Sequence, residues 1–395
     1  MAKGLVAVVG GGAAGIMSAI CLARVGCPVV LCERLDQLGK KVLASGGGRC
    51  NFSNVSLDPS FFHEEDRPFV EGVLNRFGKK EIDEFFRELG LWSYAGEDGR
   101  MFPISNRSAT VMDVLKDELE RLKIQIEYGF DADVIQKSQN GFELRSKSGK
   151  KIFAEKVVLC AGGKTYPALG SDGSGYALAA AFGHTIIAPV PITLPIVVKD
   201  PWCHLLQGQK VKARAASRVD GMEGEWLLGD VLFTKYGLSG TAIFDCTDAV
   251  SLALNRTKDA RQVEVVVDFV PFMSEEELFR EFERKLAHGF KASQLIDGIL
   301  SPKFGLVLKD YLKTDRTREL AKLLKKRAFK VEATRGWNEA EFTAGGVAID
   351  EVNSQTLESK KQPGLFFAGE ILNVQGRRGG YNLAWAWASG AVIGQ

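Results

Sequence analysis

The sequence has few of the residues from which disulfide frameworks and metal centres are built. Its seven cysteines show no C-x-x-C pair and no regular spacing, and its four histidines form no metal-ligand pattern. An odd number of cysteines without a secretory signal is typical of reduced thiols. We therefore expect a cytoplasmic protein with no structural disulfide and no metal site.

A surplus of charge is also missing. Lys and Arg together number 51 and Asp and Glu 49, which gives a formal net charge of +2. This balance provides no broad attraction for nucleic acid or for an anionic membrane, so neither is expected as a partner. The uncharged stretch 4–23 resembles a membrane span or, after Lys3, a signal peptide. Three adjacent glycines would break a spanning helix, so we reject both interpretations.

Residues 5–33 follow the order strand, glycine turn, helix, strand and acid, which is typical of a dinucleotide-binding site. A short apolar run leads into Gly10–Gly15, and a helix rich in small residues follows. We expect Gly10 to allow the tight turn, Gly12 to admit a pyrophosphate, and Gly15 to let helix and strand pack closely. The first N–H groups of the helix and the positive end of its dipole would bind the phosphates.

Glu33 completes this pattern at the end of the second strand. It lies 18 positions after Gly15, near the spacing of about 20 at which an acid binds the ribose of an adenosine. The alternative is an ordinary strand–turn–helix with spare glycines, which explains neither the acid nor its position. The segment therefore predicts a dinucleotide-binding domain.

The next stretch, residues 39–54, combines three adjacent glycines with hydroxyl, amide and basic side chains. Such a stretch does not build a core, but it lets a backbone lie flat against a ligand. It follows the carboxyl end of the second strand, the edge at which open parallel sheets bind ligands. We expect this stretch to contact the same ligand, and a surface loop is the alternative.

Three later segments end in a similar way. Residues 156–163 and 364–370 are apolar strands that end in glycine, and Gly379–Gly380 precede a C-terminal helix. A ligand contacted by all these segments is larger than NAD requires, and FAD fits better. We expect Glu370 to accept hydrogen bonds from the ribityl chain. The N–H groups at 380–383 would face the flavin edge that gains negative charge on reduction.

The composition of the chain predicts three parts. Short alternating strands over 191–270 indicate an inserted β domain, and residues 271–335 indicate a helical subdomain. Residues 1–190 and 336–395 then form a discontinuous FAD-binding domain, in which residues 69–89 have an amphipathic helical pattern. Thr317–Phe329 is helical in pattern and strongly basic; phosphate contact is one interpretation, and a solvated helix face is the simpler one.

These motifs together resemble a known family. Gly10–Gly15, Ser45–Asn51, Thr343–Val347, Phe367–Glu370 and Gly379–Asn382 are similar to the HI0933/YhiN/BaiN-like family of bacterial FAD-dependent (NAD(P)/FAD) oxidoreductases, and the match covers nearly the whole chain. The resemblance implies an α/β, Rossmann-like FAD domain of the two-dinucleotide-binding type, with an inserted β-barrel-like domain and a small helical subdomain. It also implies tightly bound FAD, reduction by NAD(P)H in at least some members, and in one type of member a link to bile-acid dehydroxylation.

The residues expected to bind FAD combine motif positions with positions that the resemblance implies. They are Gly10, Gly12, Ala13, Ala14, Gly15, Glu33, Arg34, Lys40, Lys41, Ser45, Gly46, Gly47, Asn51, Val134, Ala161, Gly162, Gly163, Gly369, Glu370, Gly380, Tyr381, Asn382 and Leu383. The insertion has no second G-x-G-x-x-G. A nicotinamide nucleotide would therefore bind transiently, over the flavin face.

The sequence identifies no catalytic residue. Cys50 is a candidate redox thiol, although a packed, inert cysteine is the simpler interpretation. Lys164, Tyr166, Arg377 and Tyr381 are candidates for contact with a small-molecule substrate, and the adjacent Arg377 and Arg378 favour an acidic one.

The acceptor of the electrons stays open between an enone and an amine or ketone. Two other classes of protein also stay open. A flavin-dependent tRNA-modifying enzyme would suit the basic stretch, but the near-neutral net charge disfavours it. A flavin-holding interaction protein without turnover is the third possibility.

Overall fold

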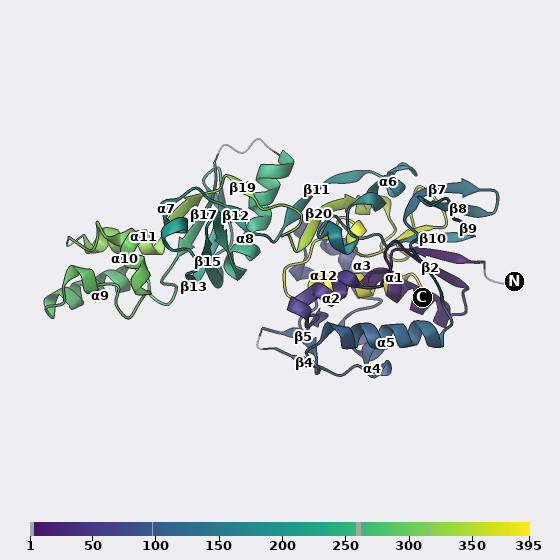
Figure 1. The fold of residues 1–395 in the computed structure, drawn as a ribbon, viewed down its shortest axis with the longest axis horizontal. Helices are drawn as coiled ribbons and strands as arrows, with labels where there is room; N and C mark the ends of the chain where they lie inside the picture. The colour runs from purple at the N-terminus through teal and green to yellow at the C-terminus, as the bar shows by residue number, and fades with distance from the viewer. Residues whose placement is uncertain (1–3, 97, 258–261, 315) are drawn as a thin grey trace. The chain divides into compact units, whose positions relative to one another are not determined.

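The structure, a computed structural model, describes residues 4–96, 98–257, 262–314 and 316–395. The chain forms two compact units (Figure 1). Unit 1 consists of Met1–Pro189 and Phe342–Gln395, and unit 2 consists of Val190–Glu341. Among the described residues, no helix has both the length and the apolar composition needed to cross a bilayer.

Unit 1 is built on a parallel sheet with the strand order β21-β10-β1-β2-β6. The central strand, β1, is buried along its whole length, as expected where a parallel sheet is covered on both faces. Because all five strands run the same way, their carboxyl ends lie at one edge. The strands are β1 (Val6–Val9), β2 (Val29–Glu33), β6 (Gln125–Tyr128), β10 (Lys156–Leu159) and β21 (Leu365–Phe367).

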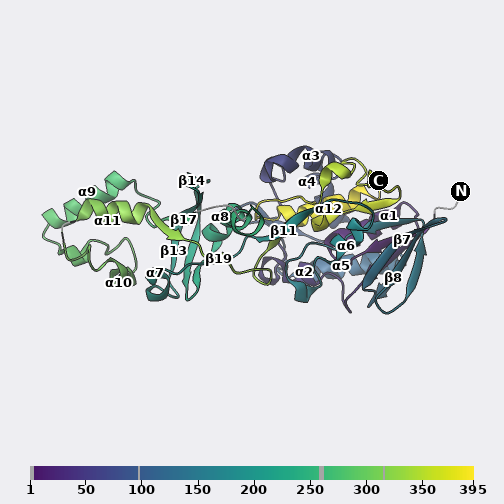
Figure 2. The same ribbon diagram turned by 90° about the horizontal axis from the view of Figure 1, so that it is seen from above.

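Helices and smaller sheets complete unit 1 (Figure 2). Its helices are α1 (Ala13–Arg24), α2 (Lys40–Gly48), α3 (Arg67–Leu74), α4 (Lys79–Glu88), α5 (Ser108–Arg121), α6 (Ser174–Ala180) and α12 (Tyr381–Val392). The smaller sheets are β3 (Ser53–Asn54) with β5 (Arg100–Pro103) and β4 (Ser93–Ala95), and β7 (Ala132–Ser138) with β8 (Gly141–Ser146) and β9 (Lys151–Ala154). β11 (Ile186–Ile192), which belongs to unit 1 up to Pro189, pairs with β20 (Phe342–Val347).

The last helix, α12, connects distant segments of unit 1. At Gly390 it lies so close to α1 that an added Cβ would be 2.4 Å from the backbone oxygen of Ala14. Trp387 donates its ring N–H to Phe52 O (3.1 Å), and Trp385 donates to Gly369 O (3.2 Å). α12 therefore holds the chain after the second strand and the chain after β21 against the start of α1.

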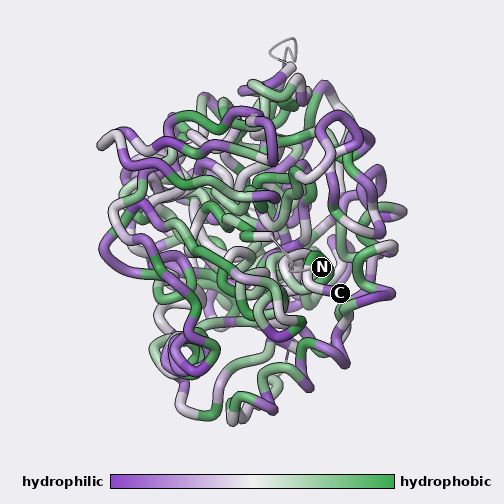
Figure 3. The backbone as a smooth tube through the Cα atoms, turned by 90° about the vertical axis from the view of Figure 1, so that its right-hand side faces the viewer, coloured by the Kyte–Doolittle hydropathy of each residue, from purple (hydrophilic) through white to green (hydrophobic). Residues whose placement is uncertain are grey.

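Unit 2 contains a sheet with the strand order β18-β17-β13-β15-β16-β12-β19, and β14 pairs with β13. Strands and helices share one core, in which Phe233, Phe269, Phe304 and Phe329 pack together. Figure 3 colours the backbone of the described residues by hydropathy, with both hydrophobic (green) and hydrophilic (purple) segments. The elements are β12 (Ile196–Val197), β13 (Lys210–Val219), β14 (Met222–Glu223), β15 (Leu227–Thr234), β16 (Gly237–Ser239), β17 (Val263–Asp268), β18 (Arg327–Lys330), β19 (Ala333–Thr334), α7 (Pro201–Leu205), α8 (Thr241–Leu252), α9 (Glu275–Ala287), α10 (Gly305–Leu308) and α11 (Thr317–Lys325). The barrel-like closure of this unit stays a prediction.

Two helices predicted from sequence patterns are wrong in extent. Residues 69–89 form two helices, α3 and α4, because Gly78 begins a new helix and donates its N–H to the Glu81 carboxylate (2.9 Å). The pattern over 317–329 is helical only to Lys325. Arg327–Lys330 instead pairs with β17 and buries Phe329, so a tertiary contact overrides the local periodicity.

The close contact at Gly390 predicts how stability responds to a single methyl group. Helix propensity alone would make Gly390→Ala stabilising by roughly 1 kcal/mol. The clash with Ala14 O should outweigh this gain, because backbone atoms cannot rotate away. We expect the free energy of unfolding to fall by about 1–3 kcal/mol, measured by urea unfolding followed with near-ultraviolet circular dichroism.

Gly305→Ala in α10 is the matched control. An added Cβ there has nothing within 4 Å, so this variant should be as stable as the parent protein or slightly more stable. Equal stability of the Gly390→Ala variant and the parent would contradict the close packing of α12 on α1.

Candidate functional site

The glycine turn after β1 is held against the acid that ends β2. Glu33 is only 8% exposed, and its carboxylate accepts the N–H groups of Gly11 (2.6 Å) and Leu35 (2.8 Å). Gly10 donates its N–H to Cys32 O (2.8 Å). These bonds fix the acid beside the turn, as the spacing of the two motifs predicts.

The glycines of this turn serve different purposes. An added Cβ on Gly15 would lie 1.8 Å from Gly10 O, so Gly15 lets α1 pack against the turn. On Gly12 an added Cβ would have no atom within 4 Å, and the backbone there has an ordinary φ of −84°. Gly12 is therefore not needed for packing, and the open space in front of it is available to a ligand. This space lies at the N-terminus of α1, whose first residues are Ala13 and Ala14.

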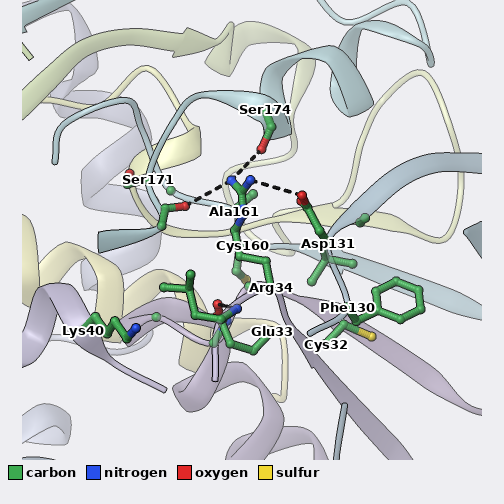
Figure 4. A pocket seen from close by; sticks show the side chains of 18 of the residues that line it. Cys32, Glu33, Arg34, Lys40, Phe130, Asp131, Cys160, Ala161, Ser171 and Ser174 are labelled. Carbon is green, nitrogen blue, oxygen red and sulfur yellow. Dashed lines mark hydrogen bonds and ion pairs between the residues drawn. The ribbon is translucent and has the colours of Figure 1, made fainter. Parts of the chain in front are cut away.

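A cavity opens at this edge of the sheet (Figure 4). It encloses about 710 Å³, counted out to its open side. The residues predicted to bind FAD that line it are Gly10, Gly12, Glu33, Arg34, Lys40, Lys41, Ala161 and Gly162. Val134 is not among the lining residues, although Phe130, Asp131 and Ala132, just before it in the chain, are.

Arg34 lines this cavity and is held by two acids. Its guanidinium forms an ion pair with Asp131 (3.2 Å) and donates to Ser174 Oγ (3.4 Å), as Figure 4 shows. It forms a second ion pair with Asp172 (2.7 Å). Burial raises the pKa of the Asp172 carboxyl, but hydrogen bonds from Arg34 and Ser174 outweigh this effect and lower the pKa to about 2. Asp172 is therefore ionised at neutral pH and holds Arg34 in place. Lys40, at the rim, pairs with Asp36 (2.9 Å).

Ser171 lines the same cavity and has an unused hydroxyl. Its side chain is buried, and its Oγ has no hydrogen-bond partner in the described part of the chain. A buried polar atom without a partner costs free energy, which a ligand in the cavity would recover. Ser171 lies in a stretch of glycines, serines and an aspartate, residues 170–175. The turn-forming composition of this stretch is the one feature of the sequence that could have pointed to Ser171.

A second polar cluster surrounds Glu370. Its carboxylate accepts Lys41 Nζ (2.6 Å), Thr165 Oγ1 (3.3 Å) and the N–H of Thr343 (3.0 Å). An added Cβ on Gly163 would lie 2.4 Å from Thr343 Oγ1, so glycine is required for this close approach. The structure thus brings together three predicted residues, Lys41 of α2, Gly163 after β10 and Glu370 after β21, with Thr343 of β20, which was not among the residues expected to bind FAD.

The start of α12 is tied to the chain that follows the glycine stretch. Asn51, with its amide oriented by its neighbours, accepts the Gly380 N–H (2.9 Å) and donates to Ser53 O (3.0 Å). Asn54 Nδ2 donates to Gly379 O (2.9 Å). These bonds join two of the predicted segments although 325 positions separate Asn54 from Gly379.

Side chains after Gly380 stabilise the helix start. Asn382 binds both the N–H and the carbonyl of Gly376 (2.9 and 2.7 Å). The Tyr381 ring is buried and stacks on Phe61, with ring centroids 4.5 Å apart. Leu383 packs against the core of unit 1. A ligand would therefore meet the backbone of this segment. The Gly380 N–H is already bonded to Asn51, and contact of the N–H groups at 381–383 with the flavin stays a prediction.

The glycine stretch of α2 leaves helical geometry at its carboxyl end. Ser45 is extended, and Gly46 and Gly47 are left-handed, with φ of 58° and 66°. Cys50 follows, fully buried, and donates its N–H to Ser45 O (3.0 Å). Burial raises the pKa of the Cys50 thiol to about 12. The packed, inert interpretation of Cys50 therefore fits the geometry better than a redox thiol.

A Ser–His–Glu arrangement lies elsewhere in unit 1. His184 Nε2 is 2.7 Å from Ser359 Oγ, and His184 Nδ1 is 3.1 Å from Glu351 Oε2. Ser359 Oγ also accepts the N–H groups of Lys361 and Gln362, and Ser359 and His184 are buried. None of the three residues lines the cavity. The arrangement therefore braces the loop before β21. In the described parts of the chain, no group of His, Cys, Asp and Glu is arranged to hold a metal ion.

The chain is similar to a known family and to named proteins. A model of the HI0933-like protein Rossmann domain matches residues 5–395. A 3-dehydro-bile acid delta(4,6)-reductase from Clostridium scindens is 35% identical over 405 residues, covering 99% of this chain and 98% of that protein. A ribosomal RNA dihydrouridine synthase from Escherichia coli is 28% identical, with coverage of 98% and 96%.

Solved structures share the fold. A 3-ketosteroid delta1-dehydrogenase from Sterolibacterium denitrificans superposes with a TM-score of 0.52 at 13% identity, covering 100% of this chain and 99% of that chain. At this level of identity the likeness concerns the fold alone. The prediction of a Rossmann-like α/β fold that binds FAD is confirmed.

The open space at Gly12 predicts a variant that separates binding from folding. Gly12→Ala should fold normally, because its Cβ meets no protein atom, but the methyl group would occupy the place of the pyrophosphate. We expect the Kd for FAD to rise by about tenfold or more, measured by titrating the apoprotein and following flavin fluorescence. Gly15→Ala, the contrasting variant, should also lose stability. Unchanged FAD affinity in Gly12→Ala would exclude this turn as the pyrophosphate site.

The burial of Cys50 predicts its reactivity. At pH 8 the native protein should be alkylated by iodoacetamide at the partly exposed Cys27 and not at Cys50, whose raised pKa leaves almost no thiolate. Peptide mass spectrometry measures the labelling, and protein unfolded in urea, in which all cysteines should react, is the control. Native Cys50 that reacts as fast as Cys27 would reverse this assignment.

Proposed function

The chain belongs to the HI0933-like family of FAD-dependent oxidoreductases, and we propose that it reduces a carbon–carbon double bond conjugated to a carbonyl group. In this proposal NADH or NADPH supplies the electrons through bound FAD. The observation that carries the proposal is the cavity at one edge of the parallel sheet, which is lined by backbone and side-chain groups that fit FAD. The 35% identical relative, which is named as a reductase, supports the type of reaction.

The residues at this edge fit FAD. The N-terminus of α1 and the open space at Gly12 suit the pyrophosphate, Glu33 suits the adenosine ribose, and the unused Ser171 hydroxyl lies in the same cavity. Glu370 would hold the ribityl hydroxyls. The start of α12 would place backbone N–H groups and a positive dipole end at the flavin edge. FAD, when bound, supplies the hydride-transfer chemistry.

The acceptor class follows from the names of the two relatives. A delta(4,6)-reductase acting on a 3-dehydro bile acid removes double bonds conjugated to a ketone. A dihydrouridine synthase removes the ring double bond of uridine, which is conjugated to a carbonyl group. The two substrates differ in size and charge, but the reduced bond is of one type. We therefore infer this type of bond for the present chain, carried by a small-molecule enone.

The nicotinamide nucleotide has no Rossmann site of its own in this proposal. Its nicotinamide would reach the flavin from the open side of the cavity and leave before the acceptor binds. The nicotinamide nucleotide and the acceptor would thus bind one after the other at the same open side of the cavity.

Reduction of uridine in ribosomal RNA is the second candidate, favoured by the Escherichia coli relative. The basic stretch at the end of α11 does not add to it. Lys325 pairs with Asp268 (2.7 Å), Lys326 with Glu223 (2.7 Å), and Arg327 with Asp200 (2.5 Å). Charges neutralised in this way contribute little attraction for phosphates.

Anaerobic spectroscopy tests the proposal. We expect NADH or NADPH to bleach the visible band of the bound flavin, and a 3-oxo-4,6-diene steroid to restore it with a gain of H2 in the product. Unmodified ribosomal RNA is the parallel acceptor, with dihydrouridine detected by mass spectrometry. If neither nucleotide bleached the flavin, the protein would be a flavin-holding module without turnover, and the proposal would fail.

A further inference from the structure

An exposed row of apolar side chains lies on one face of the hairpin formed by β4 and β5 in unit 1. Trp92 is 67% exposed and Ile104 is 61% exposed, and the two are directly opposite, joined by a bond from Ile104 N to Trp92 O (2.9 Å). Tyr94 is the next outward residue on β4 and pairs with Phe102 on β5. We call these four residues the aromatic face; its exposed part is formed by Trp92, Ile104 and Tyr94, and Phe102 lies buried beneath them at 5% exposure.

The aromatic face is held rigidly. The opposite side of the hairpin is buried through Met101, and Ser53 in β3 pairs with Met101. The rings of Tyr94 and Phe102 are 5.9 Å apart, and the Tyr94 hydroxyl donates to Asn106 Oδ1 (2.6 Å). The exposure of Trp92 and Ile104 is therefore not the result of a loose hairpin. Contiguous exposed apolar side chains of this kind mark binding surfaces.

One end of the aromatic face reaches the glycine stretch that is expected to contact the flavin. The guanidinium of Arg49 lies 4.8 Å from the centre of the Phe102 ring, and Arg49 Nε donates to Gly46 O (3.3 Å). A Cβ on Gly46 would be 3.6 Å from the Phe102 ring. A ligand lying on the face would thus extend from this stretch outward over Tyr94, Trp92 and Ile104.

The charge near the aromatic face identifies its ligand. Arg49 is exposed and makes no ion pair within the described residues, whereas Arg100 is paired with Asp98. Arg107, which follows Asn106 at the start of α5, is likewise exposed and makes no ion pair within the described residues. An exposed arginine with an available charge, beside an apolar surface, fits an apolar ring system with a negative group. Two such arginines are few for a polyanion, which requires several cations along its path.

From this geometry we infer that the aromatic face docks the ring system of a polycyclic enone acid, with Arg49 as the cation for its acidic group. This inference rests on the proposed function, because it names the substrate class of the same site. It assigns Trp92 and Ile104 as residues that determine specificity. They bind the part of the acceptor that does not react.

Binding to the oxidised holoenzyme tests the inference without turnover. Isothermal titration calorimetry with a 3-oxo-4,6-diene bile acid should show that Trp92→Ala and Ile104→Ala each raise the Kd about tenfold. Phe153→Ala on β9 is the matched control, because Phe153 is equally exposed at 61% but lies on another sheet. Its Kd should stay within about twofold of the parent value.

The charge is tested separately with Arg49→Gln. This variant should weaken binding of the acid but not of its methyl ester, so the ratio of the two Kd values changes. FAD content is measured in parallel, because Arg49 contacts Gly46. Equal effects on acid and ester would remove Arg49 as the partner of the carboxylate.

Several outcomes would overturn the docking surface itself. The first two are absence of steroid binding and unchanged steroid affinity in both apolar variants. The other two are effects on a different partner with steroid binding intact: loss of a dimer in Trp92→Ala, or loss of RNA binding in the apolar variants. The proposed function is checked independently with a small cyclic enone, which has no ring system to dock. If one of these outcomes occurred and the small enone still reoxidised the reduced flavin, the inference would fail but the proposed function would stand.

Discussion

The packing of α12 is the constraint on which the site depends. A helix from the C-terminus approaches α1 closely at Gly390, and its two tryptophans hold the backbone at Phe52 and Gly369. Ser389 adds a third bond, accepting the Gly369 N–H (2.9 Å). None of these contacts touches the expected ligand directly. They bring a segment near residue 50 and a segment near residue 370 to the glycine turn at residue 12, and without this convergence no elongated ligand could be held.

The charged groups of the site are already paired within the protein. Lys41 binds Glu370, and Arg34 binds two aspartates. These pairs are partly exposed, and pairs of that kind contribute only about 0–1 kcal/mol each. A ligand can therefore replace one partner of a pair at small cost. The pairs hold the side chains in fixed positions until then, which reduces the entropy that binding must remove.

The sequence predicted those parts of the site that depend on short spacing. Gly12, Gly15 and Glu33 follow a pattern within one strand–helix–strand unit, and the structure places them as the pattern requires. Glycine-ended strands identified Gly163 and Glu370, because parallel strands end at one edge. Ser171 and Asp131 could not be found in this way. Their importance depends on which segments meet across the cavity, and no periodicity encodes that. The break at Gly78 and the end of α11 at Lys325 were missed because a local cap and a strand pairing override amphipathic periodicity.

The distribution of charge, rather than its total, separates the two classes of acceptor. A net charge of +2 is compatible with local basic surfaces, so it excludes RNA only weakly. Neutralisation of Lys325, Lys326 and Arg327 by nearby acids is the stronger argument, because a polyanion gains affinity only from cations whose charge is available. A small acid needs one such cation, and Arg49 beside an apolar surface is the one that we infer for it. With this arrangement the affinity for the acceptor would depend only weakly on salt concentration, because a single ion pair releases few counterions.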